Sequence, residues 1–191
     1  HMKRTETMIT VNETQITMPY LVGGDKTKSA IILVHGFGAG KENMLRLGKD
    51  LTQRYYVIMP DLPGFGEASK FPELDYSILG QVNHLHAFIM QLGLTTVALA
   101  GSSMGGNIIS EYAIAYPNEV SSLLLLGPGG TKAGFDSELR QVIAKTGKNN
   151  LIAKTREEFF QTSAFVMHKP PLMPPSVLKV LADQAIANHD L

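Results

Sequence analysis

Cysteine and tryptophan are both absent from this 191-residue sequence. Without cysteine, the chain can form neither a disulfide framework nor a thiolate metal site. It also lacks an excess of either charge, because 17 lysines and arginines balance 17 aspartates and glutamates. A neutral chain with no long run of one sign is a poor candidate for binding nucleic acid or an acidic membrane surface. No pattern of His, Asp and Glu has metal-ligand spacing.

Long apolar runs are missing as well. None reaches the roughly 18 residues that a membrane span requires. The N-terminus also lacks the charged-then-apolar pattern of a signal peptide, which favours a cytoplasmic location. Because His1-Met2 looks like a cloning scar, an export signal could have been removed, and the location stays an expectation.

The part of the chain up to residue 130 alternates short β-rich apolar runs with amphipathic ones. This alternation predicts an α/β fold in which helices cover both faces of a mostly parallel sheet. An opening hairpin is expected over 7–10 and 15–22, with further strands at 30–35, 55–59, 96–100 and 120–126. Helices are expected at 41–54, 78–92 and 105–116.

After residue 130 the pattern changes to helical patches at 137–146, 156–165 and 176–187, without a strong strand-like run. Four prolines interrupt this segment between 170 and 175. We therefore predict two parts, a core over 1–130 and a helical insertion over 131–191 that covers the sheet.

Gly101-Ser102-Ser103-Met104-Gly105 matches the pattern G-x-S-x-G. The pattern alone is weak, but here it lies where a predicted strand turns directly into a predicted helix, as in a nucleophile elbow. Small residues two positions on either side of Ser103 let the strand and the helix approach closely. Ser103 is accordingly the predicted nucleophile, although a plain helix N-cap is the structural alternative.

An oxyanion hole needs two N–H donors. The N–H of Met104 follows the nucleophile and is the first candidate. The N–H of Phe37, in the loop after the strand at 30–35, is the second.

Other polar residues have structural interpretations. We expect His35 to brace its loop through a hydrogen bond, since the base normally follows the nucleophile in this kind of fold. Asp61 is expected to tie down the loop that follows it. The remaining histidines are expected at the surface or its boundary (His84, His86) or in solvent (His168, His189).

Three segments in order, HGFG (35–38), DLPGFGEASK (61–70) and GSSMGG (101–106), resemble the α/β-hydrolase superfamily. Within it, the chain is similar to bacterial lipase-3-like esterases and to monoacylglycerol lipases, and the similarity continues through 156–186. The resemblance implies hydrolysis of short- to medium-chain acyl esters or monoglycerides through an acyl-enzyme, without a cofactor. It also implies that 131–191 form a lid. Candidates for lining an acyl pocket are Phe37, Phe135, Phe159, Phe165 and Met167.

The family's triad Asp and His follow later strands, and no residue here matches them. We therefore expect the last strands to be missing, and a complementary C-terminal polypeptide or an exchanged partner chain to supply them. This chain alone would be inactive or nearly so. Two alternatives stay open. LLGPGG (125–130) is also similar to carbon–carbon bond hydrolases of ring-fission products. Those enzymes hold a substrate carboxylate with an arginine in the lid, and in an alignment Leu181 falls near the position of that arginine, which disfavours this alternative. A non-catalytic binding fragment of the same fold is the other.

Overall fold

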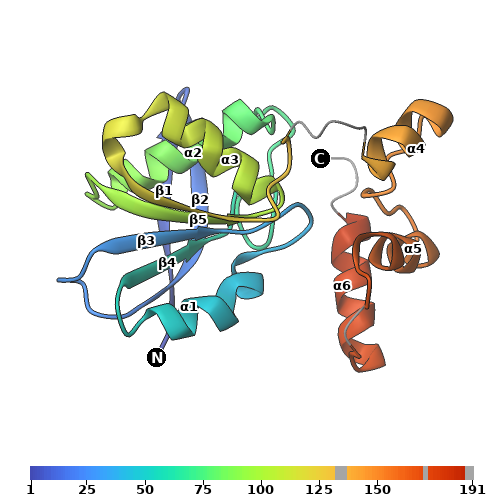
Figure 1. The fold of residues 1–191 in the computed structure, drawn as a ribbon, viewed down its shortest axis with the longest axis horizontal. Coiled ribbons are helices and arrows are strands. Elements are labelled where there is room, and N and C mark those ends of the chain that lie inside the picture. The colour runs from blue at the N-terminus through green and yellow to red at the C-terminus, as the bar shows by residue number, and fades with distance from the viewer. Residues whose placement is uncertain (132–136, 170–171, 188–191) are drawn as a thin grey trace. The chain divides into compact units, whose positions relative to one another are not determined.

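The computed structural model describes residues 1–131, 137–169 and 172–187. The chain divides into two compact units, residues 1–131 and 132–191, each described here by itself (Figure 1).

In the first unit, six strands form one sheet in the order β1-β2-β4-β3-β5-β6. The strands are β1 (Lys3–Val11), β2 (Thr14–Gly23), β3 (Ala30–Val34), β4 (Tyr56–Pro60), β5 (Val97–Ser102) and β6 (Val120–Leu126). Pairs among β4, β3, β5 and β6 are parallel, whereas β1 and β2 add antiparallel partners at one side. The predicted mostly parallel sheet is confirmed.

The opening hairpin turns at Asn12 and Glu13, which have φ values of 47° and 67°. Two consecutive positive φ angles belong to the tight turn that matches the twist of antiparallel strands. The hairpin is longer than its predicted parts because β1 and β2 pair along their whole length, from Lys3 opposite Val22 to Val11 opposite Thr14.

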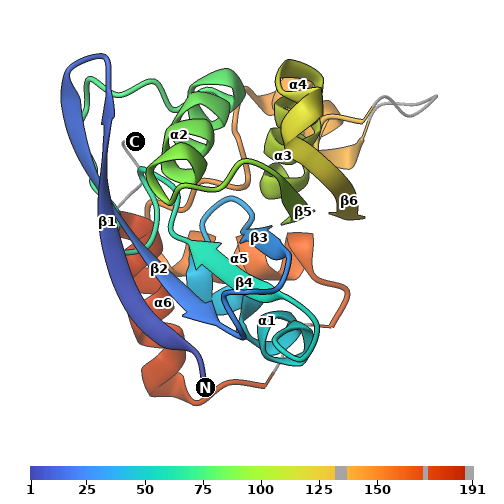
Figure 2. The same cartoon turned by 90° about the vertical axis from the view of Figure 1, so that its left-hand side faces the viewer.

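Helices cover both faces of the sheet (Figure 2). Helix α1 (Leu45–Leu51) packs on one face, where Leu33, Val57, Met59 and Ala100 form a small core with Met44. Helices α2 (Ile78–Gln91) and α3 (Met104–Ala115) pack on the other face over the larger core. The central strand β3 is buried at all five residues, as expected for a strand covered on both sides.

Two features differ from the sequence prediction. The helix expected over 41–54 is a short 3-10 turn, η1 (Lys41–Met44), followed by the seven-residue α1. The expectation that His84 lies at the surface or boundary was wrong, because its exposed fraction is 2%. Helix α2 packs against both β1 and α3, so its buried face is wider than one apolar stripe.

Strand β6 lies at the sheet edge opposite the hairpin. It pairs with β5, and within the described residues no strand pairs with its other side. Leu123, Leu124, Leu125 and Leu126 are 37–44% exposed. Apolar side chains on both faces of an edge strand are unusual for a surface.

The second unit contains α4 (Glu138–Thr146), α5 (Arg156–Val166) and α6 (Pro175–Ala187), and its described residues include no strand. The three helices predicted here are confirmed to within a residue or two. Ser137 and Thr155 cap α4 and α5 by accepting hydrogen bonds from backbone N–H groups. Helices α5 and α6 pack together, and an ion pair of 2.8 Å joins Arg156 to Asp183. Among the described residues of both units, no helix has the length and hydrophobicity to cross a bilayer.

Candidate functional site

Ser103 sits at a sharp turn between β5 and α3. Its φ and ψ are 52° and −116°. Among the described non-glycine residues, Ser103 is one of three with a positive φ. Such a conformation costs roughly 1–3 kcal/mol and persists where the surrounding structure enforces it. The serine is exposed, unlike the buried strand that leads to it. This is the geometry expected of a nucleophile elbow.

The glycines around Ser103 allow the close approach that this turn needs. A Cβ atom on Gly101 would lie 2.5 Å from the carbonyl carbon of Gly105, and one on Gly105 would lie 2.5 Å from the carbonyl oxygen of His35. A Cβ atom on Gly106 would lie 2.8 Å from Pro128. Real Cβ atoms essentially never approach so closely, so the three glycines are fixed by backbone packing.

Two backbone hydrogen bonds hold the elbow to the end of β6 and to the loop that follows it. The N–H of Ser103 donates to the carbonyl of Leu126 at 3.1 Å, and the N–H of Gly129 donates to the carbonyl of Ser103 at 2.8 Å. Both polar groups of the strained residue are therefore satisfied, which helps to maintain its conformation.

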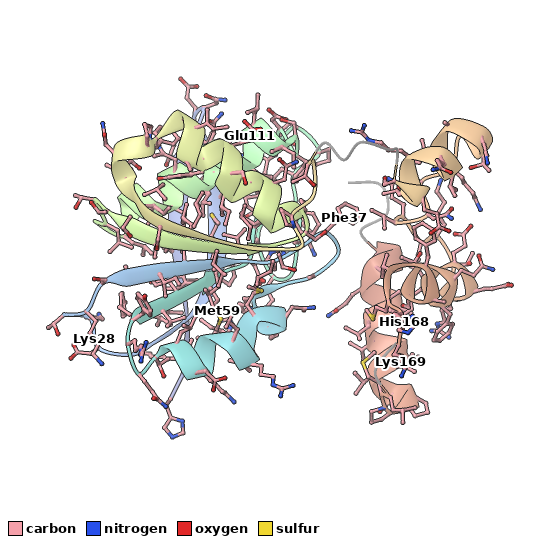
Figure 3. The ribbon with its side chains drawn as sticks, viewed as in Figure 1. Lys28, Phe37, Met59, Glu111, His168 and Lys169 are labelled. Atoms are coloured by element: carbon pink, nitrogen blue, oxygen red, sulfur yellow. The ribbon has the colours of Figure 1, made fainter. Side chains whose placement is uncertain are left out.

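The loop after β3 lies beside the elbow. A Cβ atom on Gly36 would stand 3.2 Å from Cβ and 3.8 Å from Oγ of Ser103, so this loop reaches the nucleophile's side chain. Phe37 follows in the same loop and is 47% exposed (Figure 3). Neither its N–H nor that of Met104 donates to a partner within residues 1–131, 137–169 and 172–187. Met104 is also the first residue of α3, where the helix dipole favours negative charge.

The sequence prediction that His35 braces its loop is confirmed. Its Nδ1 lies 2.8 Å from the carbonyl oxygen of Gly36, and its Nε2 accepts the N–H of Leu62 at 3.1 Å. These partners assign the proton to Nδ1. Burial lowers the pKa of His35, which keeps the ring neutral. Because both ring nitrogens are occupied, His35 has no free lone pair with which to act as a base.

Asp61 ties down its loop as predicted, and it does so through a partner that the sequence analysis did not identify. Its carboxylate accepts the N–H of Lys41 at 2.7 Å and the N–H of Glu67 at 2.9 Å. The ammonium group of Lys41 lies 2.7 Å from the same carboxylate and 2.7 Å from that of Glu67. Lys41 is 1% exposed and Asp61 is fully buried.

The charge of this buried lysine is secured by its neighbours. Burial by itself lowers the pKa of Lys41, but the hydrogen bonds to Asp61, Glu67 and Glu42 outweigh it and hold the pKa above its usual value. Hydrogen bonds from Lys41 and Arg4 lower the pKa of Glu67. Buried lysine is rare unless it is paired, and its partner Asp61 lies 20 residues away in the sequence, so the sequence carried no local signal for this pair.

Within the first unit, His86 does not stand near Ser103 as a base would. His86 resembles half of an acid–base pair, because its Nε2 lies 3.3 Å from Glu119. Its ring, however, stacks on Tyr116 at a centroid distance of 4.0 Å. Tyr116 follows α3 at its far end, about 18 Å along the axis from Met104 at 1.5 Å per residue. His168, in the second unit, is exposed as predicted, and His189 lies outside the described residues.

The predicted acyl-pocket residues of the second unit are spread over α5 and its end. Phe159 and Phe165 are half-buried, and Met167 is 41% exposed. Phe159 makes an edge contact with Phe160 at 5.8 Å. Phe135 lies outside the described residues. The assignment of these four residues to a pocket stays a prediction.

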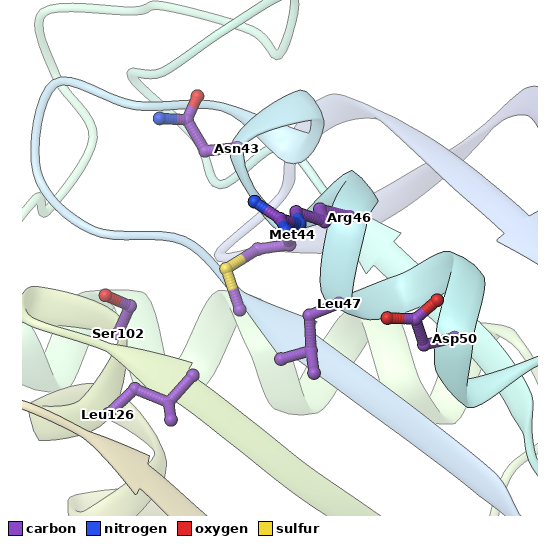
Figure 4. Close-up of a pocket in the computed structure, with 7 residues that line it drawn as sticks. All are labelled: Asn43, Met44, Arg46, Leu47, Asp50, Ser102 and Leu126. Carbon is purple, nitrogen blue, oxygen red and sulfur yellow. The ribbon is translucent and has the colours of Figure 1, made fainter. Parts of the chain in front are cut away.

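An open hollow of about 420 Å³ lies on the α1 side of the sheet (Figure 4). It is lined by Asn43, Met44, Arg46, Leu47, Asp50, Ser102 and Leu126. With Arg46 and Asp50 in its wall, it is less apolar than a typical acyl pocket. No cluster of His, Asp and Glu in the described residues could hold a metal ion.

Comparison with known proteins places this geometry in a family. The model of the alpha/beta hydrolase fold matches residues 29–169. Lipase 1 of Psychrobacter immobilis is 39% identical over 91% of this chain and 55% of its own length. Monoacylglycerol lipase abhd6-A of Xenopus laevis is 32% identical over 88% of this chain and 52% of its own length. The chain thus spans about half the length of these curated relatives.

Among solved structures, a membrane phospholipase A described as a bacterial virulence factor superposes with a TM-score of 0.89 at 34% identity. The match covers 97% of this chain and 59% of that one. Both the family and the elbow agree with the resemblance inferred from the sequence: this chain belongs to the α/β-hydrolase fold family.

Proposed function

We propose that this chain carries the nucleophile and the oxyanion hole of a serine ester hydrolase of the lipase type, acting on short- to medium-chain acyl esters or monoglycerides. The observation that carries the proposal is the strained, exposed Ser103 at the N-terminus of α3 with the Gly36 loop beside it. The names of its relatives, a lipase and a monoacylglycerol lipase, support the same class of substrate.

In the proposed reaction, Oγ of Ser103 attacks the ester carbonyl while a base takes its proton. The N–H groups of Phe37 and Met104 stabilise the oxyanion, each contributing about 2.7–4 kcal/mol to the transition state. Collapse of the intermediate expels the alcohol and leaves an acyl-enzyme, which water hydrolyses to the free acid. No cofactor takes part. The triad His and Asp would lie outside this sequence, since His35 has no free nitrogen.

We further propose that residues 131–191 act as a lid, with Phe135, Phe159, Phe165 and Met167 against the acyl chain. A complementary C-terminal polypeptide or an exchanged partner chain would cover β6. The exposed leucines of β6 and the open hollow beside Leu126 support this cover, because both leave apolar surface in solvent. The chain by itself would then have little or no activity.

The test is intact-mass spectrometry after exposure to a fluorophosphonate, on this chain and on the natural gene product that carries it. We expect one adduct on the gene product, lost in Ser103→Ala and retained in the matched control Ser102→Ala. Adduct formation that survives Ser103→Ala would overturn the assignment. Turnover of p-nitrophenyl butyrate in place of a dienone acid would separate an esterase from the carbon–carbon hydrolase alternative, which the leucine at 181 already disfavours. A binding module would show neither.

A further inference from the structure

We propose that the buried Lys41–Asp61 pair is a positioning device for the oxyanion hole, which fixes the loop that presents the Phe37 N–H. The inference rests on the proposed function of that N–H. It assigns a role in catalysis to two residues that do not touch substrate.

The two ends of the loop are anchored independently to the loop after β4. At the first end, His35 accepts the N–H of Leu62 and donates to Gly36. At the second end, Asp61 accepts the backbone N–H of Lys41 at 2.7 Å. The five residues between are 36–40 and include Phe37. Among the described backbone hydrogen bonds, one lies within this segment, from Ala39 to Gly36 at 3.3 Å, and one leaves it, from the N–H of Asn43 to Gly40 at 3.0 Å. The path of this segment therefore depends on its anchors.

Asp61 is the rigid member of the second anchor. Its carboxylate is fully buried and accepts from both sides, from Lys41 and from Glu67. Two glycines pack against this carboxylate. A Cβ atom on Gly40 would lie 2.9 Å from Oδ1 of Asp61, and a Cβ atom on Gly66, whose φ is 52°, would clash with the same carboxylate. The Nζ of Lys41 supplies the charge that keeps this carboxylate paired. A carboxylate held by one ammonium and two N–H groups has little freedom to move.

Phe65 adds a second link between the loops. Its ring contacts the rings of His35 and Phe37 edge-on, at centroid distances of 5.5 and 5.6 Å. Phe65 lies between Asp61 and Glu67, both bound to Lys41. The ion pair, the aromatic contacts and the histidine hydrogen bonds therefore all restrain the same five residues, 36–40. Because a misplacement of about 1 Å can cost 100-fold in rate, such restraint suits an oxyanion donor.

Two variants test the proposal in the natural gene product. Asp61→Asn keeps the shape but turns one acceptor oxygen into a donor that faces other donors. Lys41→Met removes the charge and leaves the backbone N–H in place. For p-nitrophenyl butyrate we expect kcat to fall by about 10- to 100-fold in Asp61→Asn and less in Lys41→Met, with KM within about twofold. The matched control is Tyr112→Phe, which loses a hydrogen bond of 2.6 Å to Glu119 away from the elbow; it should lower the melting temperature but not kcat.

Amide hydrogen exchange of Ala39, whose N–H donates the backbone hydrogen bond within 36–40, provides a readout that does not depend on activity. In Asp61→Asn we expect exchange there to accelerate by about tenfold or more, while β5 stays protected. Unchanged exchange, or faster exchange with normal kcat, would overturn the proposal. If the wild type neither hydrolyses esters nor reacts with the probe, the proposed function fails, and the link to the oxyanion hole fails with it; the exchange result then decides only whether Lys41–Asp61 anchors the loop.

Discussion

A Cβ atom on Gly101 would lie 2.5 Å from the carbonyl carbon of Gly105, so the two glycines that flank the nucleophile touch backbone to backbone. Replacing Gly101 by alanine must push α3 away from β5. We expect Gly101→Ala to lower the free energy of unfolding by about 3 kcal/mol or more, measured by urea denaturation.

Gly93 is the matched control, because its φ is +70° and no atom lies within 4 Å of an added Cβ. Gly93→Ala should cost about 1 kcal/mol, from the left-handed backbone alone. Equal costs at the two positions would contradict the close approach at the elbow.

The strain at Ser103 predicts a conflict between stability and function. Glycine adopts the φ of 52° more readily than alanine does. Although glycine also gains entropy in the unfolded state, we expect Ser103→Gly to be more stable than Ser103→Ala by about 1 kcal/mol in thermal melts. Neither variant should react with a fluorophosphonate. A less stable Ser103→Gly would show that the turn is not strained.

The sequence predicted the sheet and the elbow because both depend on local patterns. Continuous apolar runs mark buried parallel strands, as in β3, and the spacing of glycine around Ser103 reflects a turn made by neighbouring residues. The predicted boundaries of α2 agree with the structure to within a residue, and capping residues fix both of its ends. Ser77 accepts the N–H of Gly80 at the start of α2, and Gly93 ends it in the left-handed region.

The features that were missed depend on contacts between distant segments. The buried charge of Lys41 requires Asp61, 20 residues away, and a lysine in isolation is expected in solvent. His84 was assigned to the surface or its boundary because α2 was treated as having one apolar stripe, whereas it packs against both β1 and α3. The spacing of apolar residues along a helix identifies the face that packs on the sheet, but it does not reveal that a second helix packs beside it.

Two buried histidines predict a loss of stability in mild acid. Burial lowers the pKa of both His35 and His84 in the folded state, whereas unfolded histidine has a pKa of about 6.5. The unfolded state therefore binds more protons below pH 6.5, so the stability contribution is complete above that pH and is lost as the pH falls toward the folded pKa. We expect a loss of about 1 kcal/mol per histidine between pH 6.5 and 5.5.

Urea denaturation at several pH values measures this slope. His84→Phe should reduce it by about half, because one of the two titrating groups is gone. The control His168→Gln, at an exposed position, should leave it unchanged. A slope that His84→Phe does not alter would mean that the ring of His84 is protonated in the folded protein.

The exposed edge of β6 predicts self-association of this chain. Leu124 pairs in register with Ala100, which packs on the α1 face, and Leu123 pairs with Leu99 in the larger core, so leucines face both sides of an edge strand. Such an edge recruits other strands, and a lysine on it prevents pairing.

In sedimentation velocity we expect concentration-dependent association of the wild-type chain, reduced by Leu124→Lys. Met8→Lys, on the exposed part of β1 at the other side of the sheet, is the control and should associate like the wild type. A wild-type chain that stays monomeric at about 100 μM, where exposed strand edges normally aggregate, would show that the leucines are covered within the chain itself.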